Sequence, residues 1–181
     1  MKKIMFNDKY GLTAAVLKGK KTQTRRTFLK PGEEHLLHGI TPEYLIAAES
    51  RYKVGETIAI AQSYKDIHAE ILREVGHFDL KKEFQQSKGY TNKLFVRAEK
   101  MPHAIRITNI RVEHLQDITE EDCIKEGVIA SKNYNGCYVA GISDTFDTPR
   151  EAYSTLIDHI SGKGTWESNP YVFVYDFELI D

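Results

Sequence analysis

The side chains best suited to chemistry lie in one basic segment near the N-terminus, residues 19–26. The segment reads Gly-Lys-Lys-Thr-Gln-Thr-Arg-Arg, and five cationic side chains with no acid lie between Lys18 and Arg26 in a chain whose formal net charge is -1. Because like charges at this density repel one another, the run is a candidate site for an anionic partner. The alternative is a solvated basic turn at the surface.

Two threonines within the segment, Thr22 and Thr24, add short hydroxyls that can donate or accept hydrogen bonds, or act as nucleophiles beside the amines. Lys21 could act as a base only if its pKa fell from about 10.4 towards neutrality. The positive charges of the neighbouring lysine and arginines would lower the pKa of Lys21 in that direction. The segment therefore contains a candidate nucleophile and a candidate base.

Ordered elements are expected to hold this segment. Residues 8–18 have the amphipathic spacing of a helix, with Asn7 or Asp8 as its cap, and Gly19 stands where a helix usually stops. On the other side, the chain leads towards a break at Pro31-Gly32. The basic side chains would then be positioned by the end of a helix.

Two further helices are predicted in the second half of the chain. Thr119 is a good N-cap, and the helix it opens should end at Gly127, which leaves Glu126 in the last turn. There the helix dipole disfavours the negative charge of Glu126 by about 0.3–1 kcal/mol. Thr148-Pro149 begins another helix, whose continuous apolar stripe runs until Gly162 and indicates a place in the core.

Alternating or continuous apolar patterns predict the strands, over residues 3–6, 57–61, 105–115 and 171–179. In the third strand, the apolar parity changes between Ile107 and Ile110, which predicts a bulge or break near Asn109. Asn135-Gly136 suggests a hairpin turn. Between the second and third strands, Ile67, Ile71 and Val75 have helical spacing, and residues 64–93 are interpreted as an insertion.

Composition indicates a globular protein in which any binding of an anion would depend on a local cationic site and not on the net charge. The 181 residues are 41% apolar and 10% aromatic, which argues against disorder, and the pI near 6.7 gives no overall attraction to nucleic acid. No apolar run approaches the ~20 residues of a membrane span, and the N-terminus lacks a signal-peptide core, so a cytoplasmic protein is expected. Cys123 and Cys137 form no CxxC pair, and His35 and His38 lack accompanying ligands; no metal and no cofactor are expected.

Three blocks of the sequence, in order, resemble the ASCH domain family, most closely its phage-type members. They are residues 19–26, 101–119 and 164–174. The resemblance implies an α+β fold of PUA-like type, a small mixed β-barrel with peripheral helices, in a single domain over residues 1–181 with the insertion at about 64–93. One departure is Ile60-Ala61-Gln62, which stands where Val-Arg-Glu is common in the family.

The family resemblance implies two functions for the same cleft. The first is binding of RNA or a nucleotide- or nucleoside-type ligand, with phosphate contacts and an aromatic side chain such as Tyr138 or Trp166 stacked on a base. The expected ligand-binding residues are Lys20, Thr22, Arg25 and Arg26, together with Lys21. Apart from the two functions that the resemblance implies, a role as an accessory protein of a phage or mobile element, acting through protein contacts, stays open.

The second implied function is that of an amidohydrolase, because characterised relatives include N(4)-acetylcytidine amidohydrolase. Motif position implies Lys21 as base, Thr24 as nucleophile and Glu126 as acid, acting on an acylated, modified nucleoside. In a straight strand, Lys21 and Thr24 would point to opposite faces, so the trio requires a turn. Plain structural roles stay open for each: Thr24 as a barrel hydroxyl, Lys21 as a phosphate contact, and Glu126 as an ion-pair partner of the basic segment.

Overall fold

The computed structural model of this protein describes residues 1–29, 33–77, 79, 82–131 and 138–180. Its chain forms two compact units. The first unit contains Met1–Phe6 and Thr57–Ile105 together with the C-terminal end, and the second contains Asn7–Glu56 and Arg106–Leu179. The expected turns at Pro31-Gly32 and Asn135-Gly136 lie outside the described residues.

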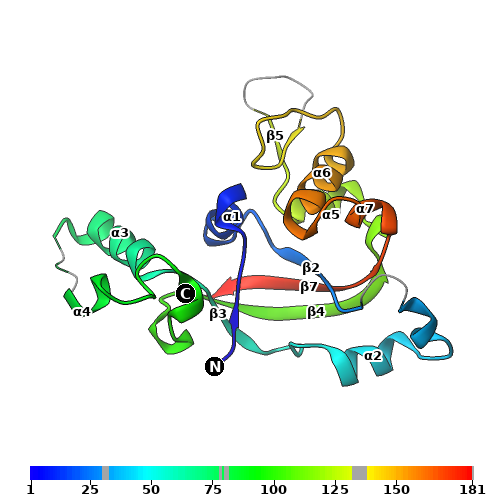
Figure 1. Ribbon diagram of the computed structural model, residues 1–181, viewed down its shortest axis with the longest axis horizontal. Coiled ribbons are helices and arrows are strands. Elements are labelled where there is room, and N and C mark those ends of the chain that lie inside the picture. Colours follow the sequence, from blue (N-terminus) through cyan, green and yellow to red (C-terminus); the bar gives the residue numbers. More distant parts are fainter. Residues whose placement is uncertain (30–32, 78, 80–81, 132–137, 181) are drawn as a thin grey trace. The chain divides into compact units, whose positions relative to one another are not determined.

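The fold is mixed α+β, as the sequence predicts, with one five-stranded sheet. The strand order β1-β3-β4-β7-β2 joins Lys3–Ile4, Thr57–Ile60, Ala104–His114, Tyr171–Ile180 and Gln23–Thr27. Within the second unit, β4, β7 and β2 run side by side (Figure 1). A separate two-stranded sheet pairs β5, Ile129–Ala130, with β6, Tyr138–Val139.

The first unit is built on β1 and β3, which pair in parallel. Its helices are α3, Tyr64–Val75, and α4, Lys82–Gln85. A capping box between Ser63 and Asp66 begins α3, which confirms the helical spacing seen in the sequence. The small core of this unit contains Ala59, Ala61, Val96, Ala98 and Met101.

The helix expected over residues 8–18 is two elements rather than one. A 3-10 turn, Asp8–Tyr10, is followed by α1, Leu12–Leu17, because Gly11 between them has a left-handed φ of 69°. The predicted ends are correct: the Asn7 side chain accepts from the Lys9 amide, and Gly19 has a φ of 64°. Further along lie a 3-10 turn, Glu34–Leu37, and α2, Pro42–Glu49.

Three helices of the second unit, α5 (Glu120–Lys125), α6 (Pro149–Ser161) and α7 (Thr165–Ser168), pack together beside the strands (Figure 1). The predicted caps are confirmed, since Thr119 accepts from the Asp122 amide and Thr148 from the Glu151 amide. The apolar stripe of α6 is buried at Ala152, Tyr153 and Leu156. The starts of α5 and α6 therefore depend on cap residues next to them in the sequence.

The long strand β4 runs without a break from Ala104 to His114. Its buried positions nevertheless change parity, because Ile105 and Ile107 are buried, Thr108 and Asn109 are both exposed, and Ile110 is buried again. The parity change predicted near Asn109 is present, while a break in the strand is not. Among the described residues, no helix has the length and apolar character to cross a membrane.

The pairing of β2 with β7 gives β2 two chemically different faces. Antiparallel register places Thr24 opposite Tyr175, Arg25 opposite Val174 and Arg26 opposite Phe173. Because side chains alternate along a strand, Gln23 and Arg25 lie on one face and Thr24 and Arg26 on the other. We call the first the carboxylate face, after the acids that Arg25 binds, and the second the aromatic face, after the rings of β7.

Candidate functional site

Lys21 and Glu126 form a buried ion pair on the carboxylate side of β2. The Lys21 Nζ donates to Glu126 Oε2 at 2.6 Å and to the Glu126 carbonyl oxygen at 2.7 Å. Their side chains are only 2% and 5% exposed. The backbone supports this pair, because the Thr22 amide donates to the Lys125 carbonyl at the end of α5. Two of the three residues expected to be catalytic are therefore in direct contact.

Burial lowers the pKa of Lys21 below its ordinary value, because an ammonium loses its hydration in the interior. The carboxylate of Glu126 raises the pKa of Lys21, whereas the nearby positive charges of Arg26 and Arg25 lower it further. The direction of the change is the one that a general base requires.

Arg25 makes the second set of contacts to the same carboxylates. Its side chain is fully buried and donates to Glu126 Oε1 at 3.2 Å, to Glu113 Oε1 at 2.6 Å and to Asp122 Oδ2 at 3.0 Å. Burial by itself would lower the pKa of Arg25, but the charge of Glu126, with a contribution from Glu113, outweighs it and raises the pKa. Arg25 is thus a fixed cation at the centre of an acidic cluster.

The cluster continues outwards through Arg111 and Gln23. Arg111 pairs with Glu113, Asp122 and Asp176, and the Gln23 amide donates to Asp122 and Asp176. Burial alone would raise the pKa of Asp122, but the hydrogen bond from Arg25 and the charges of both arginines lower it overall. The cations on this side of β2 are thus neutralised by four carboxylates, those of Glu113, Asp122, Glu126 and Asp176.

Sequence reasoning missed most of these carboxylates, although part of the signal was present. Asp122 and Glu126 are four residues apart on one helix and so share a face. Arg111 and Glu113 share the parity of one face of the predicted strand. Nothing in the sequence joins either pair to Arg25, so only the folded chain reveals the cluster.

Thr24 lies away from this cluster. It is buried within β2, opposite Tyr175 on the aromatic face, whereas Arg25 and its carboxylate partners occupy the other face. The structure therefore brings Lys21, Arg25 and Glu126 together and points the Thr24 side chain in the opposite direction. Lys21 and Thr22 precede β2, which is extended from Gln23 onwards.

Arg26 lines a cavity of about 220 Å³ on the aromatic face. Its aromatic walls are the rings of Phe28, Tyr52, Phe173 and Tyr175. The other lining residues are polar: Arg26, Thr27, Glu49 and Arg51. We call this the aromatic cavity. It combines rings with two guanidinium groups and one carboxylate, supplied by β2 and the residue after it, by the end of α2 and the segment that follows it, and by β7.

The rings of the aromatic cavity support one another in two pairs. The Phe28 and Phe173 centroids lie 4.2 Å apart, and Tyr52 and Tyr175 meet edge to face at 5.1 Å. The guanidinium carbon of Arg51 lies 5.5 Å from the centroid of the Tyr52 ring. Burial raises the pKa of Tyr52, so its hydroxyl stays neutral at physiological pH.

The remaining expected binding residues lie elsewhere. Lys20 is exposed and Thr22 is half-buried just before β2. Trp166 stacks with the Arg150 guanidinium and borders a different cavity, of about 360 Å³, beside α6. Neither Trp166 nor Tyr138 lines the aromatic cavity. Among the residues that the structure describes, no group of histidine, cysteine or acidic side chains is arranged to hold a metal ion.

Comparison with known proteins leaves the family unassigned. The chain matches no protein-family model and no curated protein. Among solved structures, it is similar to the protein EF3133 from Enterococcus faecalis V583, of the DUF984 family, with a TM-score of 0.44 and 13% sequence identity. That similarity covers 100% of this chain and 77% of the other.

Proposed function

We propose that this protein binds a nucleotide- or nucleoside-type ligand, free or within RNA, in the aromatic cavity, and that its fold is an ASCH-type, PUA-like barrel. The observation that carries the binding proposal is the meeting of four aromatic rings with Arg26 and Arg51 around one cavity. Aromatic rings stack on bases, and arginines bind phosphate through paired N–H donors. Arg26 is the contribution of the basic segment to this site.

The carboxylate face is a poor binding site for an anion. Lys21 and Arg25 are buried there and already paired with Glu126, Asp122 and Glu113. A phosphate would have to displace these carboxylates and leave them unpaired in the interior, which is costly. The proposed anion contacts are therefore the two arginines of the aromatic cavity, Arg26 and Arg51.

The size of the cavity limits what can enter. A volume of about 220 Å³ lies below the roughly 300–1,000 Å³ typical of pockets for drug-sized ligands. One base with part of its sugar is a suitable occupant, whereas a duplex would keep its bases stacked inside the helix. The ligand is therefore a single nucleotide or one unstacked nucleotide of a single strand.

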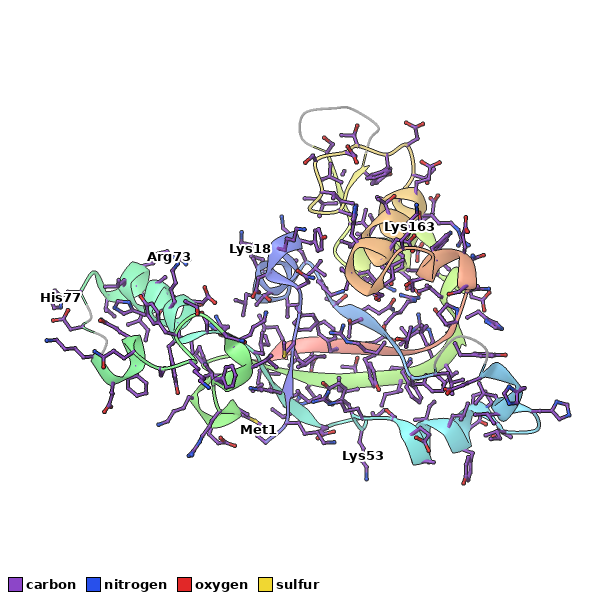
Figure 2. The ribbon with its side chains drawn as sticks, viewed as in Figure 1. Met1, Lys18, Lys53, Arg73, His77 and Lys163 are labelled. Atoms are coloured by element: carbon purple, nitrogen blue, oxygen red, sulfur yellow. The ribbon has the colours of Figure 1, made fainter. Side chains whose placement is uncertain are left out.

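The test is equilibrium binding of a fluorescently labelled single-stranded hexaribonucleotide, followed by anisotropy at several salt concentrations. Arg26→Ala and Arg51→Ala are each expected to weaken binding at least about tenfold, because each removes a charge-assisted contact. Lys53→Ala is the matched control: it removes a charge from the same loop, and Figure 2 shows the Lys53 side chain pointing away from the ribbon. Equal loss in all three variants, or no binding by the wild type, would overturn the proposal.

A second candidate, amide hydrolysis on an acylated nucleoside, is favoured by one observation. Lys21 touches Glu126 at 2.6 Å, and burial lowers the pKa of Lys21 as a base requires. The direct assay is incubation with N(4)-acetylcytidine and mass detection of the deacetylated product. Lys21→Ala should abolish turnover. Thr24→Val distinguishes two possible nucleophiles. Loss of activity would identify the Thr24 hydroxyl as the nucleophile, and retained activity would identify water.

A further inference from the structure

The aromatic cavity contains one carboxylate among its cationic and aromatic groups, and this side chain has no part in binding phosphate. Glu49, at the end of α2, lines the cavity together with Arg26 and Arg51. A carboxylate would repel an anion, so its presence indicates a ligand group that donates hydrogen bonds. We propose, resting on the function proposed above, that the cavity selects guanine, with Glu49 and one arginine reading the base.

Guanine has complementary groups on two adjacent edges. Its O6 and N7 atoms accept hydrogen bonds, and arginine binds this pair in a bidentate manner. Its N1–H and exocyclic amino group donate side by side, and the two oxygens of a carboxylate can accept both. Guanine therefore satisfies an arginine and a glutamate at the same time.

The other bases satisfy Glu49 less well. Adenine and cytosine each place one amino donor beside a ring nitrogen that accepts hydrogen bonds, and uracil places a single N–H between two carbonyl oxygens. In each case an acceptor would face the carboxylate, or one carboxylate oxygen would keep water instead of a donor from the base. Because Glu49 is exposed, the preference for guanine comes from its two hydrogen bonds to the charged carboxylate, which the other bases cannot both make.

The charges also distinguish a nucleotide from a nucleoside. Arg26 and Arg51 provide two positive charges and Glu49 one negative charge. When one arginine and Glu49 contact the base, the second arginine lies in the same cavity wall and can contact the phosphate. The rings of Tyr52 and Phe173 provide apolar walls for the base between these polar contacts. A guanosine nucleotide should thus bind more tightly than guanosine.

The experiment measures calorimetric dissociation constants for GMP, IMP, AMP, CMP, UMP and guanosine, and for hexaribonucleotides with one or no guanine. We expect GMP to bind at least about tenfold more tightly than AMP, CMP and UMP, with IMP, which lacks the amino group, in between. Tighter binding of the guanine-containing hexamer than of GMP would identify RNA as the source of the base. Glu49→Gln should weaken GMP binding at least about tenfold and leave AMP binding nearly unchanged, because only guanine uses both carboxylate oxygens.

Glu43→Gln is the matched control, since Glu43 is exposed on the same helix and does not line the cavity. Glu49 is itself exposed, so its variant should fold, and a thermal melt checks this. Equal binding of all four mononucleotides, or a silent Glu49→Gln, would overturn guanine selection while the proposed function stands. Failure of every nucleotide and oligonucleotide to bind would overturn both.

Discussion

Arg25 and Arg26 are neighbours in the sequence but lie on opposite faces of β2, one opposite Val174 and the other opposite Phe173. Arg25 is buried among Glu113, Asp122 and Glu126, whereas Arg26 is half-buried and lines the aromatic cavity. The two guanidinium groups therefore have different tasks. The first neutralises the interior of the second unit, and the second lines the candidate binding site.

This division predicts opposite consequences for two adjacent substitutions. Arg25→Ala leaves three carboxylates without their central cation and should lower the free energy of unfolding by about 3–5 kcal/mol. Arg26→Ala should lower it by no more than about 1 kcal/mol, and its main effect should be on ligand binding. Urea unfolding followed by circular dichroism measures both. Similar destabilisation by the two variants would contradict the assignment of the two faces.

The Lys21–Glu126 pair should show strong energetic coupling. Glu126→Gln should destabilise the protein by about 3–5 kcal/mol, because it leaves the Lys21 ammonium buried without its counter-charge. Lys21→Met should destabilise it less, because Glu126 keeps its ion pair with Arg25. The double variant should be more stable than the sum of the two losses indicates, since the uncompensated ammonium is then gone. A double-mutant cycle from urea unfolding measures this coupling. Simple additivity of the two losses would show that the contact contributes little.

The lowered pKa of Asp122 predicts a loss of stability in acid. In the folded protein, this pKa lies below the ordinary value of 3.8, so the unfolded chain takes up the proton first as the pH falls. The contribution of Asp122 is fully present above that value and is lost as the pH falls through the folded pKa. The stability difference between the wild type and Asp122→Asn should be largest near neutrality and should shrink below about pH 4. Urea midpoints at a series of pH values measure it; a constant difference is the contrary outcome.

Cys123 should resist alkylation in the native protein. It belongs to α5, its side chain is fully buried, and burial raises the pKa of the thiol to about 12. Iodoacetamide at pH 8 should leave the peptide that contains Cys123 unmodified until urea unfolds the chain, as peptide mass spectrometry would detect. Rapid native labelling of this cysteine would mean that α5 opens readily and would weaken the account of the buried cluster.

Local signals in the sequence were sufficient for much of the fold. The sequence predicts Thr119 and Thr148 as caps and Gly19 and Gly127 as helix ends, because these roles depend on one side chain and the few backbone groups beside it. The strand over residues 171–179 was evident from its alternation and is β7 in the structure. The main local error was Gly11, whose left-handed φ divides the first helix without interrupting its apolar spacing.

The sequence by itself determined that a cationic segment follows a short helix and that Glu126 stands at the end of another, since both statements concern residues close together in the chain. Only the tertiary structure decided what these charges meet. Lys21 reaches Glu126 across 105 positions, and Arg26 shares a cavity with Glu49 and Arg51. The physical reason is that the register of β2 against β7 and the packing of α5 determine which side chains meet on each face of β2. Both depend on contacts between residues far apart in the chain.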